Sequence, residues 1–131
     1  MPQIFVVHGA LGSAAQMAPI AGALAALGTV HNVELPGHGR TVLPASSDFS
    51  MHTFVRALES KLRGANADIT QKPFVFGYSM GGYAALALEA EHPGTFAGIL
   101  TLGTKFAWTP EVALREAGRL NADVIAEKIP K

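Results

Sequence analysis

The feature that most constrains the fold is a serine enclosed by glycines at residues 77–82, Gly-Tyr-Ser-Met-Gly-Gly. It follows a β-rich apolar run and precedes an alanine-rich apolar stretch that ends at Pro93. A strand that turns directly into a helix has no room for side chains two positions before and two positions after the turn residue, which explains Gly77 and Gly81. We therefore expect Ser79 at a strand-to-helix turn with strained backbone angles. An ordinary glycine turn with a helix-capping serine is the alternative.

Short apolar runs and helix-length segments alternate along the rest of the chain. The predicted strands are Ile4–Val7, Thr29–Leu35, Phe74–Phe76 and Ala97–Leu102. The predicted helices are Pro19–Leu27, residues 51–63 after a Ser50 cap, Ser79 to about Glu91, and a last helix from Pro110 after a Thr109 cap. Apolar positions recur at helical spacing in the second helix, at Phe54, Val55, Leu58 and Leu62. This alternation predicts right-handed crossovers and a three-layer α/β/α fold with a mostly parallel sheet.

A second glycine-containing loop, His8-Gly9-Ala10-Leu11-Gly12, follows the first predicted strand. Acyl transfer requires hydrogen-bond donors for a developing oxyanion, and backbone N–H groups in a fixed loop supply them. One donor would be the amide of Met80, directly after the serine, and the other would come from Ala10 or from Leu11. Phosphate binding is a poorer interpretation, because a dinucleotide fold requires Gly-x-Gly-x-x-Gly and this loop has only Gly-x-x-Gly.

A third motif, Leu35-Pro36-Gly37-His38-Gly39-Arg40, follows the second predicted strand. Together the three motifs resemble those of the α/β-hydrolase superfamily, and the resemblance extends from Ile4 to about Trp108. It is strongest to the small, cofactor-free esterase, thioesterase and lyase-like members. The sheet order of this family implies that strand 74–76 lies in the middle. The first strand and strand 97–102 would flank it, and strand 29–35 would lie outside the first.

The resemblance also implies roles for individual residues. Ser79 would be the nucleophile, and the backbone amides of Met80 and Ala10 would form the oxyanion hole. Gly9, Gly77 and Gly81 would support the site. His8 would order the oxyanion loop.

The sequence departs from the family after the serine. The family supplies its acid and then its histidine from loops after later strands. After Ser79 the only histidine is His92, and about 18 Å of helix would separate the two, too far for a base. Residues 103–105 offer no acid, and the family's N-terminal antiparallel hairpin is absent. We therefore expect an incomplete α/β-hydrolase fold that lacks this hairpin and the C-terminal strands, with a partial core at 1–108 and the start of a cap at 109–131.

The other ionisable residues have structural or solvent-exposed interpretations. His31 lies in or beside a strand, and His52 lies near a helix N-terminus. His38 lies in a loop at the carboxyl edge of the sheet, so it is the first residue to examine if this chain has a base. The carboxylates expected to be solvated are Asp48, Asp68 and Asp123. No group of residues has metal-ligand spacing.

Composition excludes several classes of protein. The ten basic and ten acidic residues cancel, which argues against nucleic-acid or anionic-membrane partners. The absence of cysteine excludes disulfides, thiolate metal sites and a cysteine nucleophile. We find no signal-peptide pattern at the N-terminus and no apolar run long enough to cross a membrane. The expectation is a cytoplasmic protein that needs no cofactor or metal.

Charged residues make up only 15% of the chain, against about 25% in a typical soluble domain. This scarcity predicts apolar faces that another segment or a second subunit covers. If the sheet ends with strand 97–102, that strand forms an apolar edge without charge or proline to block pairing. We therefore expect a homo-oligomer that buries this strand or the sheet face beside it.

These observations predict a serine hydrolase that acts on a small carboxylic ester or thioester through an acyl-serine intermediate. Since neither the acid nor the catalytic histidine is recognisable, little or no turnover is expected of these 131 residues alone. A non-catalytic truncated module, or half of a split enzyme that needs a partner chain, is the alternative. A lyase, a carbon–carbon bond hydrolase or a cofactor-free peroxidase on the same fold also stays open.

Overall fold

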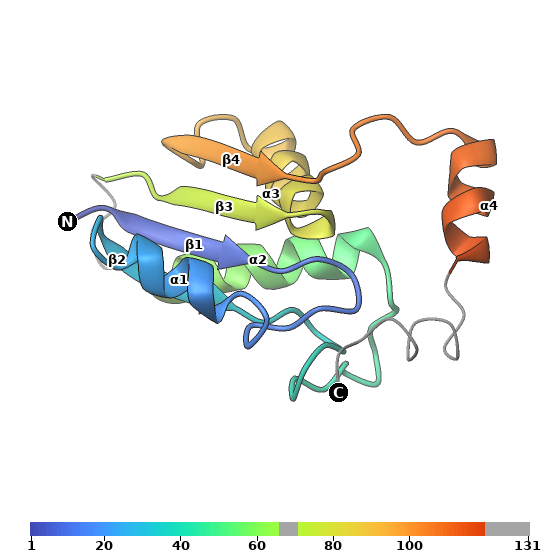
Figure 1. Cartoon of the computed structure of the whole chain (residues 1–131), viewed down its shortest axis with the longest axis horizontal. Coiled ribbons are helices and arrows are strands. Elements are labelled where there is room, and N and C mark those ends of the chain that lie inside the picture. The colour runs from blue at the N-terminus through green and yellow to red at the C-terminus, as the bar shows by residue number, and fades with distance from the viewer. Residues whose placement is uncertain (66–70, 120–131) are drawn as a thin grey trace.

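The protein's structure, a computed structural model, describes residues 1–65 and 71–119. The strands are β1 (Gln3–Val7), β2 (Thr29–Val33), β3 (Phe74–Tyr78) and β4 (Gly98–Leu102). They form one sheet in the order β2-β1-β3-β4, and every pair of neighbours is parallel (Figure 1). The sheet order implied by the family resemblance is therefore confirmed.

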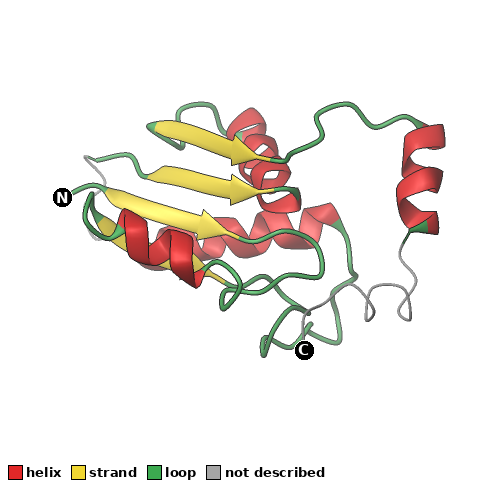
Figure 2. Cartoon of the chain, viewed as in Figure 1, coloured by secondary structure: helices red, strands yellow, loops and turns green. Residues whose placement is uncertain are grey.

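Helices cover both faces of this sheet, as the alternation of elements predicts (Figure 2). The helices are α1 (Ala18–Leu24), α2 (Met51–Ala65), α3 (Met80–Glu91) and α4 (Pro110–Gly118). Helices α2 and α3 pack together on one face, and α1 lies on the opposite face over β1 and β2. The predicted three-layer architecture is confirmed for the described residues.

Several predicted boundaries differ from the observed ones by one to three residues, and the ends of β2 and α1 differ for local reasons. Strand β2 ends at Val33 instead of Leu35, because the N–H of Leu35 donates to the imidazole of His8 at 3.0 Å instead of to a strand. Helix α1 ends at Leu24 instead of Leu27, where the N–H of Leu27 donates to the Leu24 carbonyl in a turn.

The hydrophobic core lies between the sheet and the α2–α3 layer. All four apolar positions predicted for the second helix are buried, namely Phe54, Val55, Leu58 and Leu62. They belong to one cluster with Phe5 and Val75 of the sheet and Leu88 of α3. Burial of such side chains stabilises the fold by about 2 kcal/mol each, so α2 anchors the layer that supports α3.

The opposite face of β3 and β4 is largely uncovered in the described part of the chain. Phe74 is 45% exposed, Leu100 is 61% exposed and Leu102 is 52% exposed. These side chains alternate with Val75 and Ile99, which pack toward the core on the other face. The low charge content therefore corresponds to a real apolar surface beside the edge strand.

Helix α4 is set apart from the sheet, beyond the carboxyl ends of the strands (Figure 1). Its N-cap is as predicted, since the hydroxyl of Thr109 accepts a hydrogen bond from the N–H of Val112 at 3.1 Å. The rest of the predicted cap segment, residues 120–131, lies outside the described residues, as do Asp68 and Asp123. No helix in 1–65 or 71–119 has the length and apolar character needed to cross a membrane.

Candidate active site

Ser79 occupies the turn between β3 and α3 with φ 51° and ψ −116°. A positive φ is uncommon for a residue other than glycine and costs of order 1–3 kcal/mol. The Ser79 side chain makes no capping hydrogen bond to α3, although the residue occupies the N-cap position. The helix-capping alternative is therefore wrong, and the predicted strained turn is confirmed.

Glycines permit this turn because backbone crowds them from several sides. A Cβ added to Gly77 would lie 2.7 Å from the carbonyl carbon of Gly81, and one added to Gly81 would lie 2.8 Å from that of Val7. A Cβ on Gly9 would lie 3.1 Å from the Cβ of Ser79. The first contact is within the turn, whereas the other two join the turn to the end of β1.

The backbone of Ser79 is held by the end of β4 and the loop after it. Its N–H donates to the carbonyl of Leu102 at 2.8 Å, and its carbonyl accepts from the hydroxyl of Thr104 at 2.8 Å. The sequence gives no local signal for either contact, because the partners lie more than twenty positions away. The only hint is that Thr104 follows the strand next to the turn.

The loop after β1 is a tight turn beside Ser79. The N–H of Gly12 donates to the carbonyl of Gly9 at 3.0 Å, and Leu11 between them has φ 62°. Within the described residues, no acceptor takes a hydrogen bond from the N–H of Ala10, Leu11 or Met80. These are the groups that the sequence nominates as oxyanion donors.

His8 connects this loop to the end of β2. Its Nε2 accepts from the N–H of Leu35 at 3.0 Å, which leaves the proton on Nδ1 to be donated to the Gly9 carbonyl at 2.8 Å. The ring is buried, and burial lowers the pKa of His8 from its ordinary value of 6.5. His8 is therefore a neutral ring with both nitrogens occupied, which suits the predicted ordering role.

Glu34, directly after β2, accepts hydrogen bonds from two loops. Its carboxylate accepts from the N–H of Ala14 at 3.2 Å and from the Thr41 hydroxyl at 2.9 Å. The bond from Thr41 and further backbone bonds lower the pKa of Glu34. The neighbouring Asn32 donates to the Ala14 carbonyl at 2.7 Å. The local sequence gives no signal for the contacts of these two side chains, one in β2 and one directly after it.

A cavity of about 530 Å³ opens beside Ser79, and we call it the nucleophile cavity. It is lined by Ala10, Met51, Ser79, Met80, Tyr83, Lys105, Trp108, Ala113, Glu116 and Ala117. Most of these side chains are apolar, and the volume is typical of a small-molecule site. Helix α4 supplies one wall, where Glu116 accepts from the ammonium of Lys105 at 2.9 Å. The Lys105 bond also lowers the pKa of Glu116.

None of the five histidines of the sequence, all of which are described, lines the nucleophile cavity. His38 is buried between the rings of His8, Phe49 and Phe54, and its Nδ1 lies 3.1 Å from the Pro36 carbonyl. The possibility that His38 is a base therefore has no support from its position.

The other histidines have structural or exposed positions. His92, at the far end of α3 from Ser79, lies 3.4 Å from the carboxylate of Glu59. His31 stacks on Phe5, and His52 is exposed. Asp48 is exposed as expected, and it also accepts from the hydroxyls of Ser50 and Thr53 at the start of α2.

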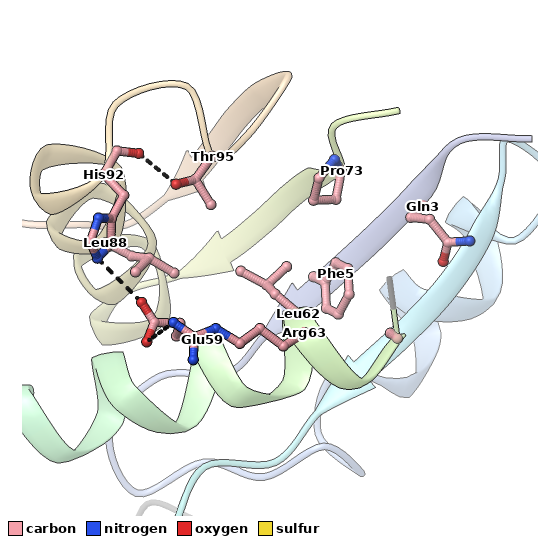
Figure 3. Close-up of a pocket in the computed structure, with 10 residues that line it drawn as sticks. Gln3, Phe5, Glu59, Leu62, Arg63, Pro73, Leu88, His92 and Thr95 are labelled. Atoms are coloured by element: carbon pink, nitrogen blue, oxygen red, sulfur yellow. Dashed lines mark hydrogen bonds and ion pairs between the residues drawn. The ribbon is translucent and has the colours of Figure 1, made fainter. Parts of the chain in front are cut away.

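A second cavity, of about 330 Å³, lies at the opposite edge of the sheet (Figure 3). Gln3 and Pro73, at the amino ends of β1 and β3, line it together with the Glu59–His92 pair. In parallel α/β sheets ligands bind at the carboxyl ends of the strands, where Ser79 lies. The nucleophile cavity is therefore the candidate active site. Among the residues that the structure describes, no group of three His, Cys, Asp or Glu could hold a metal ion.

Comparisons with known proteins agree with this geometry. The family model described as serine aminopeptidase, S33, matches residues 2–131. Human monoglyceride lipase is 32% identical over 112 residues, which cover 84% of this chain and 37% of that protein. The chain therefore spans little more than a third of the length of this curated relative.

Solved structures show the same fold. A monoacylglycerol lipase from Paleococcus ferrophilus matches with a TM-score of 0.69 and 21% identity, over 92% of this chain and 48% of that one. A structure from a study of carboxylesterases of the thaumarchaeon Nitrososphaera gargenis matches with a TM-score of 0.75 and 22% identity, over 90% and 43%. At these identities the likeness concerns the fold alone.

Proposed function

The chain belongs to the serine aminopeptidase S33 family of α/β-hydrolases, and from that premise we propose that it supplies the nucleophile and oxyanion hole of a carboxylic ester hydrolase. The observation that supports this most strongly is the backbone of Ser79, strained at φ 51° and ψ −116° on the wall of an apolar cavity. A turn that only capped a helix would need no such strain.

The proposed reaction is acyl transfer through Ser79. The Ser79 oxygen attacks the ester carbonyl while a base takes its proton, and the N–H groups of Met80 and Ala10 donate to the oxyanion. The tetrahedral intermediate collapses to an acyl-serine, and the leaving alcohol receives the proton. Water then attacks the acyl-serine by the same steps and releases the carboxylic acid.

No histidine of this chain lies where it could act as the base. His8 has both nitrogens occupied, His38 is enclosed by aromatic rings, and the remaining three histidines lie away from the nucleophile cavity. We therefore propose that a histidine and an acid, on additional chain or on a partner, complete the site. The chain alone would retain only the catalysis that the oxyanion hole and substrate binding provide.

The substrate that fits is a small ester or thioester with an apolar group. Met51, Tyr83 and Trp108 offer apolar surface within reach of Ser79. Human monoglyceride lipase, a relative by sequence, is an ester hydrolase by name. The fold also suits lyases and carbon–carbon bond hydrolases. An acyl group found on Ser79 would favour ester hydrolysis over both.

The experiment is hydrolysis of p-nitrophenyl butyrate by the 131-residue chain and by Ser79→Ala. We expect wild type to release p-nitrophenol slowly and Ser79→Ala to release it no faster than buffer. Ser60→Ala, at an exposed serine of α2, is the matched control and should keep the wild-type rate. Fast turnover that depends on Ser79 would show that these residues contain a base after all. Equal rates for wild type and Ser79→Ala would contradict the proposed nucleophile and favour the non-catalytic module.

A further inference from the structure

The peptide unit between Ser79 and Met80 is held from one side by Thr104. The Thr104 hydroxyl donates to the Ser79 carbonyl at 2.8 Å, which is the shortest bond that this carbonyl accepts. The N–H groups of Gly82 and Tyr83 also reach it, at 3.1 and 3.3 Å. One carbonyl is thus shared by the first turn of α3 and by a side chain from the loop after β4.

The carbonyl of Ser79 and the N–H of Met80 belong to the same planar amide. The structure has no cis peptide bond in its described residues, and in a trans peptide the two groups point in opposite directions. A partner that fixes the carbonyl therefore fixes the direction of the N–H. Met80 is also the first residue of α3, where an N–H has no acceptor within the helix.

The approach of Thr104 to this peptide requires glycine at two positions. Gly103 has φ 64°, a left-handed conformation that bends the chain immediately after β4. A Cβ on Gly82 would collide with the Thr104 hydroxyl oxygen and would lie 2.9 Å from the methyl group of Thr101. The third glycine of the motif thus makes room for Thr104, whereas Gly77 and Gly81 make room for backbone.

We propose that Thr104 is a positioning residue for the oxyanion hole. Its hydroxyl orients the Ser79–Met80 amide so that the Met80 N–H is presented to the nucleophile cavity. By accepting this bond the amide also becomes more polarised, which strengthens its N–H as a donor. The orienting role follows from the geometry alone, and the oxyanion role rests on the proposed function.

The test of the orienting role is the backbone amide resonance of Met80 in ¹⁵N-labelled protein. We expect Thr104→Val, which removes the hydroxyl at similar volume, to shift this resonance toward weaker polarisation. Thr104→Ser should restore it. Thr101→Val is the matched control, because the methyl of Thr101 and not its hydroxyl faces Gly82. If Thr104→Val does not fold, Thr104→Ala takes its place.

The oxyanion role is tested with phenylboronic acid. Its boron accepts an electron pair from the Ser79 oxygen, the serine proton leaves to solvent, and an anionic tetrahedral adduct forms. We expect Thr104→Val to bind it about two- to tenfold more weakly than wild type, the effect of one net hydrogen bond, with Thr104→Ser and Thr101→Val close to wild type.

The two experiments test the orienting role and the oxyanion role of Thr104 separately. A Met80 resonance that moves no more in Thr104→Val than in Thr101→Val overturns the inference, whatever the protein catalyses. No boronate binding by wild type would count against the proposed function, while the resonance shift would still support the orienting role. Equal boronate affinity of wild type and Thr104→Val would overturn the oxyanion role.

Discussion

Gly81 packs its α-carbon against the end of β1, where the carbonyl groups of Val7 and His8 lie beside it. This contact brings the nucleophile turn and the oxyanion loop together, so its loss should affect both. Gly22 of α1 is the opposite case, because a Cβ there would meet nothing within 4 Å.

We predict that Gly81→Ala lowers the free energy of unfolding by about 3 kcal/mol, since the added methyl must displace backbone. Gly22→Ala should raise it by about 0.5–1 kcal/mol through helix propensity. Denaturant unfolding followed by circular dichroism measures both. A Gly81→Ala protein as stable as Gly22→Ala would show that the turn does not pack against β1 as described.

At the residue scale, the sequence predicts what depends on near neighbours. Gly77 is predictable because its collision partners, Gly81 and Gly82, lie within the same short motif. The contact of Thr104 with Ser79 and that of Glu34 with Ala14 are not predictable, because the parallel pairing of strands brings these partners together. Their side chains are also chemically ordinary for a loop and for the end of a strand.

At the scale of elements, the residue that follows β2 connects the loops around the candidate site. Glu34 holds the loop after β1 through Ala14 and its own following loop through Thr41, so three segments meet at one carboxylate. Because its pKa in the folded protein is lowered from 4.5, the carboxylate contributes stability above that pH. This contribution is lost as the pH falls through the folded pKa.

We predict that Glu34→Gln is less stable than wild type at neutral pH and that the difference shrinks below about pH 4.5, the ordinary pKa of the group. Thermal unfolding between pH 7 and pH 3 measures this difference. Glu111→Gln, which removes an exposed carboxylate at the start of α4, is the control. A Glu34→Gln deficit that is independent of pH would contradict the proposed role of the charge.

The elements themselves were largely predictable, because strand and helix periodicities differ and each helix has a recognisable start. The strand order came from the family resemblance, since periodicity does not specify which strands are neighbours. The end of β2 was missed because the decisive contact, Leu35 with His8, spans 27 positions of sequence.

At the scale of the whole molecule, the main exposed apolar surface of the described residues is the uncovered face of β3 and β4. Phe74, Leu100 and Leu102 lie on it, and β4 is the last strand of the described sheet. Apolar patches of more than a few hundred Å² rarely stay bare on a soluble monomer. The expected homo-oligomer therefore remains our proposal for the 131-residue chain, with this face at its interface.

We predict that light scattering at micromolar concentration gives a mass of at least twice 13.7 kDa. Leu100→Lys should shift the protein toward monomer by placing a charge on this face. Leu114→Lys, at a still more exposed leucine on α4, should leave the mass unchanged. A stable wild-type monomer would show that this face does not mediate self-association.

The most direct test of the central claim is the site at which an activated ester acylates the protein. After brief exposure to p-nitrophenyl butyrate, peptide mass spectrometry gives the rate of butyryl transfer to each serine. We predict that Ser79 is acylated about 10³-fold faster than the exposed Ser60, because an oxyanion hole accelerates acyl transfer even without a complete triad. Acylation of Ser79 no faster than that of Ser60 would contradict the account.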